Sequence, residues 1–325
     1  MRAGAGYRMT QHLAVSDAEI RHAAALLRAG KLVAFPTETV YGLGANALDA
    51  DAVARIFAVK GRPPSSPIIV HVSSMGMVRQ VVSEWPERAE ALAQSFWPGP
   101  LTLVLRKQPA VPNLVTAGLN TVGVRMPSHP VALALIKEAD LPVAAPSANR
   151  FTQLSPTTAE HVRRSLGSQV DYILDGGRCA VGIESTVLSL TSEESMLLRP
   201  GGISRQQIEA IIGRVVQQAE TPQQAHPSPG MHPRHYSPRT RLLLVRSGEV
   251  LTSGAGAYLQ LRNPPMWKVE ELIQMPDRPE DYAAQIYRVL HRLDALNLDW
   301  IAADAPPTTA DWEAVLDRLR RASSE

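Results

Sequence analysis

Four positively charged side chains occupy places in this sequence where such side chains are uncommon. Lys60 and Arg62 lie on either side of Gly61, at the end of an expected helix. Arg125 and Arg199 interrupt apolar stretches that are typical of buried strands. A buried guanidinium is costly without an anionic partner, and it binds carboxylates and phosphates through paired hydrogen bonds. The four residues therefore predict a basic cavity that binds a carboxylate, a phosphate or both.

The same parts of the chain carry two acidic residues, Glu38 and Glu184, and several neutral polar ones. One interpretation is that the acids pair with the arginines as structural salt bridges. The other is that the arginines are held for an anionic ligand, and His71, a lone polar residue in an apolar strand, then belongs to the same site. In that case neutral hydrogen bonds would come from Thr37, Thr39, Thr121, Ser147, Ser155 and Ser185.

The sequence lacks the patterns of covalent catalysis, so we expect chemistry by positioning and charge neutralisation. Ser147 follows an expected strand without a G-x-S-x-G motif, and we interpret it as a turn residue or a phosphate ligand. The G-x-G-x-x-A pattern at 42–47 has no acidic residue about twenty positions later. His232 and His235 have no carboxylate or cysteine neighbours, so no metal site is predicted.

The composition is that of a soluble globular protein. The chain has 325 residues, of which 45% are apolar and 20% charged, and its net charge is +2. A net charge this small does not indicate a surface for nucleic acid. The single cysteine, Cys179, excludes a disulfide framework and a cysteine-based zinc site. No apolar run is long enough for a membrane span and no signal-peptide core is visible, so we expect a cytoplasmic protein.

Hydrophobic periodicity and capping residues divide the chain into alternating helices and strands. The polar residues named above lie at the ends of these elements, where a rigid scaffold meets solvent. We expect helices at 16–29, 49–61, 73–85, 87–96, 129–139, 154–167, 204–213, 279–297 and 309–322. We expect strands at 31–35, 68–72, 101–107, within 121–130, and at 141–149, 170–177, 182–190, 196–201, 241–248, 256–261 and 299–306. Residues 37–44, which are small and polar and include Gly42 and Gly44, are expected to form a loop.

A change of composition separates two parts of the chain. Residues 216–240 are rich in glutamine, proline and histidine and have no periodicity, which is typical of a linker. The alternation of strands and helices on both sides of it indicates the α/β class. The sequence therefore predicts an α/β domain at 1–215, a linker at 216–240 and a smaller α/β domain at 241–325.

Seven segments, in this order and spacing, closely resemble the Sua5/YrdC family: FPTETVYGLGANA, KGRPPSSPIIVHV, FWPGPLTLVL, TVGVRMPSHP, PVAAPSAN, GIESTV and LLRPG. Members of this family are L-threonylcarbamoyladenylate synthases, nucleotidyltransferases that join L-threonine, bicarbonate and ATP into threonylcarbamoyl-AMP and pyrophosphate. The resemblance covers nearly the whole chain. It implies a YrdC-like catalytic domain, with a twisted mixed sheet and helices around a basic cavity, and a small Rossmann-like C-terminal domain of Sua5 type.

The resemblance also implies roles for individual residues. Lys60 and Arg62 would be catalytic, as partners of the triphosphate and the leaving group. Arg125 would clamp the threonine carboxylate, and the full L-threonine set would be Thr39, His71, Arg125, Ala145 and Ser185. ATP would be bound by Arg62, Ser66, Thr121, Ser147, Ser155 and Arg199. The linker would contact the nucleotide through His235 or Tyr236, and we hypothesise that it folds over the cavity as a lid.

The implied cofactor is Mg²⁺ bound with ATP, held by phosphate oxygens and water because no carboxylate cage is visible. The implied partners are a tRNA threonylcarbamoyl transferase, which uses the product to modify adenosine 37 of tRNA, and tRNA itself through a weak contact. One alternative is an RNA-binding module, but the small net charge and 5% aromatic content argue against it. Another is a carbamoyltransferase with a YrdC-like domain, but such proteins carry cysteine-rich zinc segments.

Overall fold

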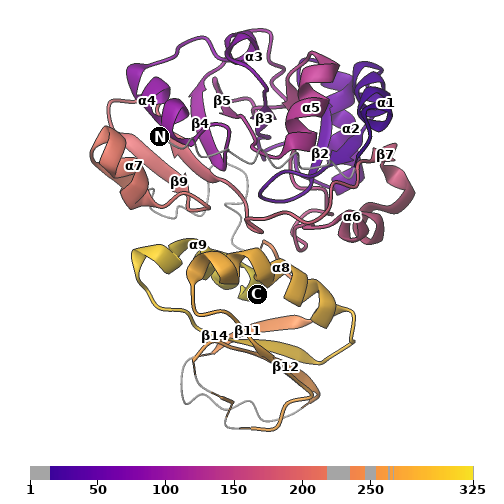
Figure 1. The fold of residues 1–325 in the computed structure, drawn as a ribbon, viewed down its shortest axis with the longest axis vertical. Coiled ribbons are helices and arrows are strands. Elements are labelled where there is room, and N and C mark those ends of the chain that lie inside the picture. Colours follow the sequence, from indigo (N-terminus) through magenta and orange to yellow (C-terminus); the bar gives the residue numbers. More distant parts are fainter. Residues whose placement is uncertain (1–14, 218–234, 246–253, 263, 266, 325) are drawn as a thin grey trace, which may run out of the picture.

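The structure is a computed structural model of the chain. It describes residues 15–217, 235–245, 254–262, 264–265 and 267–324. Figure 1 shows a larger part, which contains the N-terminal two thirds of the chain, and a smaller C-terminal part. Most of the predicted linker, residues 218–234, lies outside the described residues. The boundaries of the three predicted parts stay predictions.

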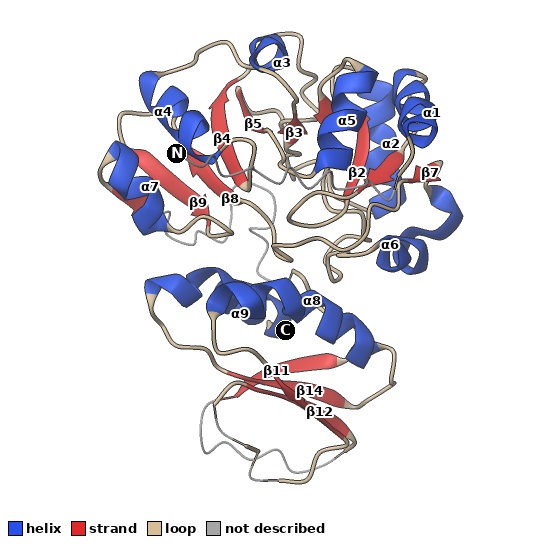
Figure 2. Ribbon diagram, in the orientation of Figure 1, coloured by secondary structure: helices blue, strands red, loops and turns tan. Residues whose placement is uncertain are grey.

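A ten-stranded mixed sheet forms the framework of the larger part (Figure 2). Its strands are β1 Val33–Phe35, β2 Gly42–Asn46, β3 Val70–His71, β4 Leu101–Arg106, β5 Thr121–Arg125, β6 Val143–Ala144, β7 Tyr172–Ile173, β8 Thr186–Ser189, β9 Ser195–Arg199 and β10 Val215–Gln217. Their spatial order is β10-β9-β8-β4-β5-β3-β6-β2-β1-β7. Neighbouring strands pair both in parallel, as β4 with β8, and antiparallel, as β4 with β5. The mixed α/β sheet expected from the sequence is confirmed.

Helices cover this sheet and bury most of its apolar side chains in one large core, while Ile69, Val104, Val187 and Leu198 form a small separate cluster. They are α1 Asp17–Arg28, α2 Ala50–Lys60, α3 Met75–Val81, α4 Glu87–Phe96, α5 Pro130–Ala139, α6 Ala159–Leu166 and α7 Arg205–Ile212, with a short 3-10 turn at Gly167–Gln169. Figure 1 shows α1, α2 and α5 gathered at one end of the sheet, and α4 and α7 at the other.

The C-terminal part is a four-stranded parallel sheet with two long helices. It contains β11 Arg241–Val245, β12 Gly256–Gln260, β13 Glu271–Gln274, α8 Pro279–Asp294, β14 Trp300–Asp304, a 3-10 turn at Ala310–Trp312 and α9 Glu313–Ser323. The strand order is β11-β14-β12-β13, and every pair is parallel. Figures 1 and 2 show α8 and α9 on the face of this sheet that is turned toward the larger part. The Rossmann-like arrangement expected here is confirmed.

Capping residues fix the helix that carries Lys60. The Asp49 carboxylate accepts hydrogen bonds from the backbone N–H groups of Asp51 and Ala52, at 3.0 and 3.1 Å, and starts α2. Gly61 ends the helix with a φ of 63°, a left-handed conformation that glycine adopts without steric cost. The chain therefore turns sharply between Lys60 and Arg62.

Three strands differ from the sequence-based expectation, and β2 is the first of them. Residues 37–44, expected to be a polar loop, contain the start of β2, which runs antiparallel to β1 and β6. A Cβ atom on Gly44 would lie 2.8 Å from Phe35 Cε1 and 2.9 Å from Val143 Cγ1. The glycines that indicated a loop are therefore present because neighbouring strands and side chains approach closely. Strands β10 and β13 were also not expected.

We expect Gly44→Ala to lower the free energy of unfolding by about 1–3 kcal/mol, because an extra methyl group overpacks a filled site. The measurement is equilibrium unfolding in urea. Gly76→Ala in α3 is the matched control, since the nearest atom to its added Cβ would be Ser74 Oγ at 3.5 Å. Alanine at that helical position should leave stability unchanged or raise it by up to about 1 kcal/mol. Equal losses in both variants would contradict the packing argument.

Candidate active site

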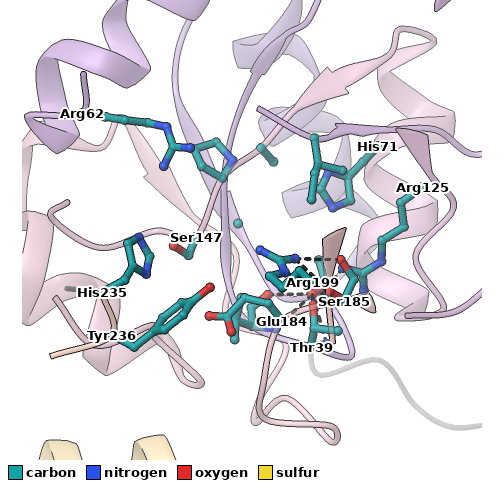
Figure 3. A pocket seen from close by; sticks show the side chains of 16 residues that line it. Thr39, Arg62, His71, Arg125, Ser147, Glu184, Ser185, Arg199, His235 and Tyr236 are labelled. Carbon is teal, nitrogen blue, oxygen red and sulfur yellow. Dashed lines mark hydrogen bonds between the residues drawn. The ribbon is translucent and has the colours of Figure 1, made fainter. Parts of the chain in front are cut away.

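A polar cavity lies at one edge of the large sheet (Figure 3). It has about 540 Å³ of empty space, part of which is open to solvent. Its wall carries three arginines, five hydroxyl groups and one carboxylate among apolar residues. The lining residues are Thr37, Thr39, Val40, Gly42, Arg62, Ile69, His71, Arg125, Ala145, Pro146, Ser147, Glu184, Ser185, Arg199, His235 and Tyr236.

Three strands that run in the same direction deliver the central residues of this cavity. His71, Arg125 and Arg199 are the last residues of β3, β5 and β9. Strand β3 is parallel to β5. Strand β4 is antiparallel to β5, β8 is parallel to β4, and β9 is antiparallel to β8, so β9 runs in the same direction as β5. Their carboxyl ends therefore meet at one edge, where α/β proteins commonly bind ligands. The expected convergence of these polar residues is confirmed.

Arg125 is held in the cavity wall by three polar groups. Its Nη1 donates to Thr39 Oγ1 at 2.9 Å and its Nε donates to the Gly99 carbonyl at 3.2 Å. Its Nη2 forms an ion pair of 2.7 Å with Glu38 Oε1, and both side chains are buried. The salt-bridge interpretation is confirmed for this pair. Glu38 thereby fixes the position of the guanidinium in the cavity wall.

The ion pair keeps Glu38 ionised in spite of its burial. Burial favours the neutral carboxyl, but the charge and hydrogen bond of Arg125 outweigh it and hold the pKa of Glu38 below its usual value. The stabilisation is therefore fully present above the pKa of an unfolded glutamate, about 4.3, and is lost as the pH falls through the lower folded value.

We expect this pair to contribute to acid denaturation. The urea midpoint of the wild type should decrease as the pH is lowered from about 5 to about 3. The urea midpoint of Glu38→Gln should be lower than that of the wild type at about pH 5, but should decrease less over the same range. Urea titrations at several pH values would measure both. An identical pH dependence of the two proteins would show that Glu38 contributes nothing to it.

His71 is neutral in this environment. Burial, with the charge of Arg125 adding to it, lowers the pKa of His71 to about 3. The ring also packs edge-on against Phe35, with the ring centroids 6.2 Å apart. An imidazole with so low a pKa is a poor proton acceptor at neutral pH. His71 is therefore suited to hydrogen bonding and shape recognition rather than to general base catalysis.

Arg62 and Arg199 place two further positive charges on the cavity. The Nε and Nη2 atoms of Arg62 donate to the carbonyls of Ser66 and Pro67 at 3.3 and 2.9 Å. Arg199 donates to the Ser185 carbonyl at 2.9 and 3.1 Å and to its hydroxyl at 3.1 Å. Burial lowers the pKa of Arg62 to about 10, and the charge of Arg199 acts in the same direction. Such mutually unfavourable cations are stabilised when an anion binds between them.

Lys60 lies behind the wall rather than in it. Its buried ammonium donates to the carbonyls of Ser147 and Asn149. Burial, with the charge of Arg62 adding to it, holds the pKa of Lys60 well below its usual value. Lys60 therefore anchors the turn that presents Ser147 to the cavity, and its direct contact with a phosphate stays a prediction.

Glu184 has a partner that the sequence did not indicate. Its carboxylate accepts hydrogen bonds from Ser155 Oγ at 2.5 Å, from the Tyr287 hydroxyl at 3.0 Å and from Arg318 Nε at 2.7 Å. Tyr287 and Arg318 belong to α8 and α9, so the C-terminal part contacts Glu184 from behind the cavity wall, although neither residue lines the cavity. Nothing in the local sequence marks Arg318, since it is one of three arginines near the end of an amphipathic helix.

The described end of the linker reaches the cavity. His235 and Tyr236 both line it, and the His235 backbone N–H donates to the Arg321 carbonyl at 3.2 Å. The Tyr236 hydroxyl is buried, points toward the cavity in Figure 3, and has no hydrogen-bond partner among the described residues. A buried hydroxyl of this kind fits a hydrogen bond to a ligand. The lid hypothesis concerns residues 218–234, which lie outside the described residues.

Three residues assigned to ATP from the family resemblance do not line this cavity. Ser66 lies beside it and accepts a hydrogen bond from Arg62 through its carbonyl. The Ser155 hydroxyl donates to Glu184. Thr121 begins β5, at the opposite end of the strand from Arg125. Their contacts with a nucleotide stay predictions.

Among the described residues, no group of three or more His, Cys, Asp or Glu side chains is arranged to hold a metal ion. His232, one member of the histidine pair noted in the sequence, falls outside them. None of the helices in the described ranges is both long and apolar enough to cross a membrane.

Comparison with known proteins connects this fold and cavity to one family. Residues 25–201 match the Sua5/YciO/YrdC family, described as Telomere recombination, and residues 203–324 match the family described as Threonylcarbamoyl-AMP synthase, C-terminal domain. The threonylcarbamoyl-AMP synthases of Pyrococcus abyssi and Bacillus subtilis are each 42% identical to the chain. The alignments cover 95% and 97% of this chain and 95% and 96% of those proteins.

The solved structure of P. abyssi Sua5 complexed with L-threonine is similar to this one, with a TM-score of 0.88 and 39% identity over 95% of each chain. Fold and sequence thus define a YrdC-type α/β domain joined to a Sua5-type C-terminal domain. The chain belongs to the Sua5/YrdC family.

Proposed function

We infer that the protein is a threonylcarbamoyl-AMP synthase, an enzyme that forms threonylcarbamoyl-AMP and pyrophosphate. Relatives with that name match it over nearly their whole length. The structural observation that carries the inference is the presence of Arg125, Arg62 and Arg199 in one cavity. Such a cavity offers one guanidinium to an amino-acid carboxylate and two to a nucleotide polyphosphate.

We propose that Arg125 binds the threonine carboxylate. It is oriented by Thr39 and Glu38, so its position does not depend on the ligand. The neutral ring of His71, at the end of the adjacent strand, would then lie beside the bound amino acid and accept or donate a hydrogen bond. The proposed threonine set also contains Ala145 and Ser185, which line the same cavity.

We propose that Arg62, Ser147 and Arg199 bind the nucleotide phosphates. In the reaction, the threonine amine forms a C–N bond with the carbon of bicarbonate, and water is lost. A carbamate oxygen then forms a bond with the α-phosphorus of ATP, the bond from that phosphorus to the bridging oxygen breaks, and pyrophosphate leaves. The leaving group gains negative charge in this step, which nearby guanidinium groups stabilise.

Several finer assignments belong to the same proposal. Mg²⁺ would arrive with ATP, held by phosphate oxygens and water, because the described residues offer no cage of carboxylates. Bicarbonate would be the third substrate. The product would pass to a tRNA threonylcarbamoyl transferase, and a weak contact with tRNA and a cytoplasmic location stay predictions of the sequence.

The test is release of pyrophosphate from ATP by the purified full chain, with and without L-threonine and bicarbonate, and with L-serine as the control amino acid. We expect release that needs both threonine and bicarbonate. Release without threonine would indicate a plain ATPase. No release, together with binding of tRNA that weakens steeply with salt, would favour the RNA-binding alternative.

A further inference from the structure

Glu184 is a buried carboxylate in the wall of a cavity whose proposed ligand is strongly anionic. It is 6% exposed and lies beside Ser185, Arg199 and Tyr236 in Figure 3. An uncompensated carboxylate at this place would repel the phosphates of ATP and would also attract the nearest cavity arginine. The identity of its countercharge therefore matters for nucleotide binding.

The countercharge comes from the other part of the chain. Arg318 of α9 is 0% exposed, and its Nε donates to Glu184 Oε2 at 2.7 Å. Its other groups are also engaged, since Nη1 pairs with Asp317 at 2.5 Å and Nη2 donates to the Pro200 carbonyl at 3.0 Å. Its guanidinium lies over the Tyr236 ring, 5.1 Å from the centroid. These contacts give Arg318 a single, fixed position.

Tyr287 of α8 completes the arrangement by donating its hydroxyl hydrogen to Glu184 at 3.0 Å. The Ser155 hydroxyl donates to Oε1 of the same carboxylate at 2.5 Å. The apolar surroundings are shared as well, because Val40, Leu154 and Ile183 of the larger part pack into the core of the C-terminal part. The geometry is therefore that of a built interface, not of a chance contact between two surface charges.

Arg199 is the cavity cation that would be diverted without Arg318. Its positive charge, like that of Arg318, favours the ionised form of Glu184. Its hydrogen bonds to the carbonyl and hydroxyl of Ser185, the residue after Glu184, place its guanidinium near Glu184 in the wall. If Arg318 were uncharged, Glu184 would draw Arg199 into an ion pair and away from a bound phosphate.

We propose that Arg318 is a positioning residue for the nucleotide half of the active site: by neutralising Glu184, it prevents that carboxylate from forming an ion pair with Arg199 and from repelling the ATP phosphates. The C-terminal domain thus acts on nucleotide binding without touching the substrates. The proposal rests on the proposed function only for the identity of the ligand as ATP.

The experiment measures ATP binding to the full chain by isothermal titration calorimetry, and the KM values for ATP and threonine. Arg318→Met should weaken ATP binding by about tenfold or more, as expected for an uncompensated buried carboxylate, and should change the threonine KM by less than about threefold. Arg318→Lys, which keeps the charge, should bind ATP almost as tightly as the wild type. Arg320→Met, at an exposed position of the same helix, is the matched control and should match the wild type.

The double variant Arg318→Met with Glu184→Gln separates an electrostatic role from simple packing. A neutral glutamine needs no countercharge, so the double variant should bind ATP within about threefold of the wild type. A folded Arg318→Met protein with unchanged ATP affinity would overturn the proposal, and so would a double variant that binds no better than Arg318→Met. If Arg318→Met does not fold, the lysine and double variants decide the question in the same way.

A different experimental result would contradict the proposed function. A wild type that binds ATP but releases no pyrophosphate with threonine and bicarbonate would contradict the synthase activity. The order of ATP affinities among the variants would still test the role of Arg318.

Discussion

Replacing Arg125 by alanine is expected to raise the KM for L-threonine by at least about 30-fold, because truncating one partner of a buried charge pair costs about 2–5 kcal/mol. The KM for ATP should change little. The reason is geometric: Arg125 is fixed by Thr39, Gly99 and Glu38 at the end of β5, whereas the proposed phosphate ligands lie on other strands and turns. Initial rates of pyrophosphate release, with each substrate varied in turn, would measure both constants.

Two further variants make this result interpretable. Arg125→Ala leaves the Glu38 carboxylate unpaired, and that charge would itself repel the carboxylate of threonine. Adding Glu38→Gln removes the repulsion, so any remaining increase in KM reports the lost guanidinium. Arg106→Ala on β4 is the control, since Arg106 is 47% exposed and its contact with Glu84 is 3.6 Å long. An unchanged threonine KM in the Arg125 variants would remove the carboxylate clamp from the mechanism.

Lys60→Ala is expected to lower kcat by about 10²- to 10³-fold, the usual cost of losing a donor that stabilises developing charge. The structure adds a second cause, since Lys60 also anchors the carbonyls of Ser147 and Asn149. Loss of charge stabilisation lowers kcat, whereas a displaced Ser147 turn raises the KM for ATP. Steady-state rates with ATP varied at saturating threonine would separate the two causes.

Lys107→Ala is the matched control for this variant. Lys107 also donates to a backbone carbonyl, that of Val111 at 2.7 Å, and to the side chain of Asn113, but it does not line the cavity. It should retain full turnover. If Lys60→Ala and Arg125→Ala affected both substrates equally, the proposed division between a phosphate half and a carboxylate half would be wrong.

The positions of the main cations could be predicted from the sequence because each one breaks a local pattern. Arg125 and Arg199 stand at the ends of apolar strands, and Arg62 follows a glycine that ends a helix. Strand directions then bring them together, since β3, β5 and β9 share one orientation. A charged residue at the end of an apolar strand indicates by itself that a polar or charged partner lies nearby, because a buried charge without one is costly.

The contribution of the C-terminal part could not be predicted in this way. Arg318 lies in an amphipathic helix with neighbouring arginines, so its charge breaks no pattern, and its burial depends on a residue 134 positions earlier. At Gly44 the sequence indicated a loop where the structure has a strand. Glycine occurs both in flexible loops and where strands pack closely, so the residue type alone does not distinguish the two. Both failures concern contacts between segments that are distant in sequence, which local periodicity does not record.

The ion pair between Glu184 and Arg318 also limits which domain chimeras of this protein can fold and function. Glu184 falls in the region that matches the Sua5/YciO/YrdC family, and Arg318 falls in the region that matches the C-terminal family. A chimera that joins the first region to a foreign C-terminal domain would bury an orphaned carboxylate unless the incoming helix carried a cation at the same place. The two domains are therefore expected to behave as a matched set, exchangeable only together with the residues that meet at their boundary.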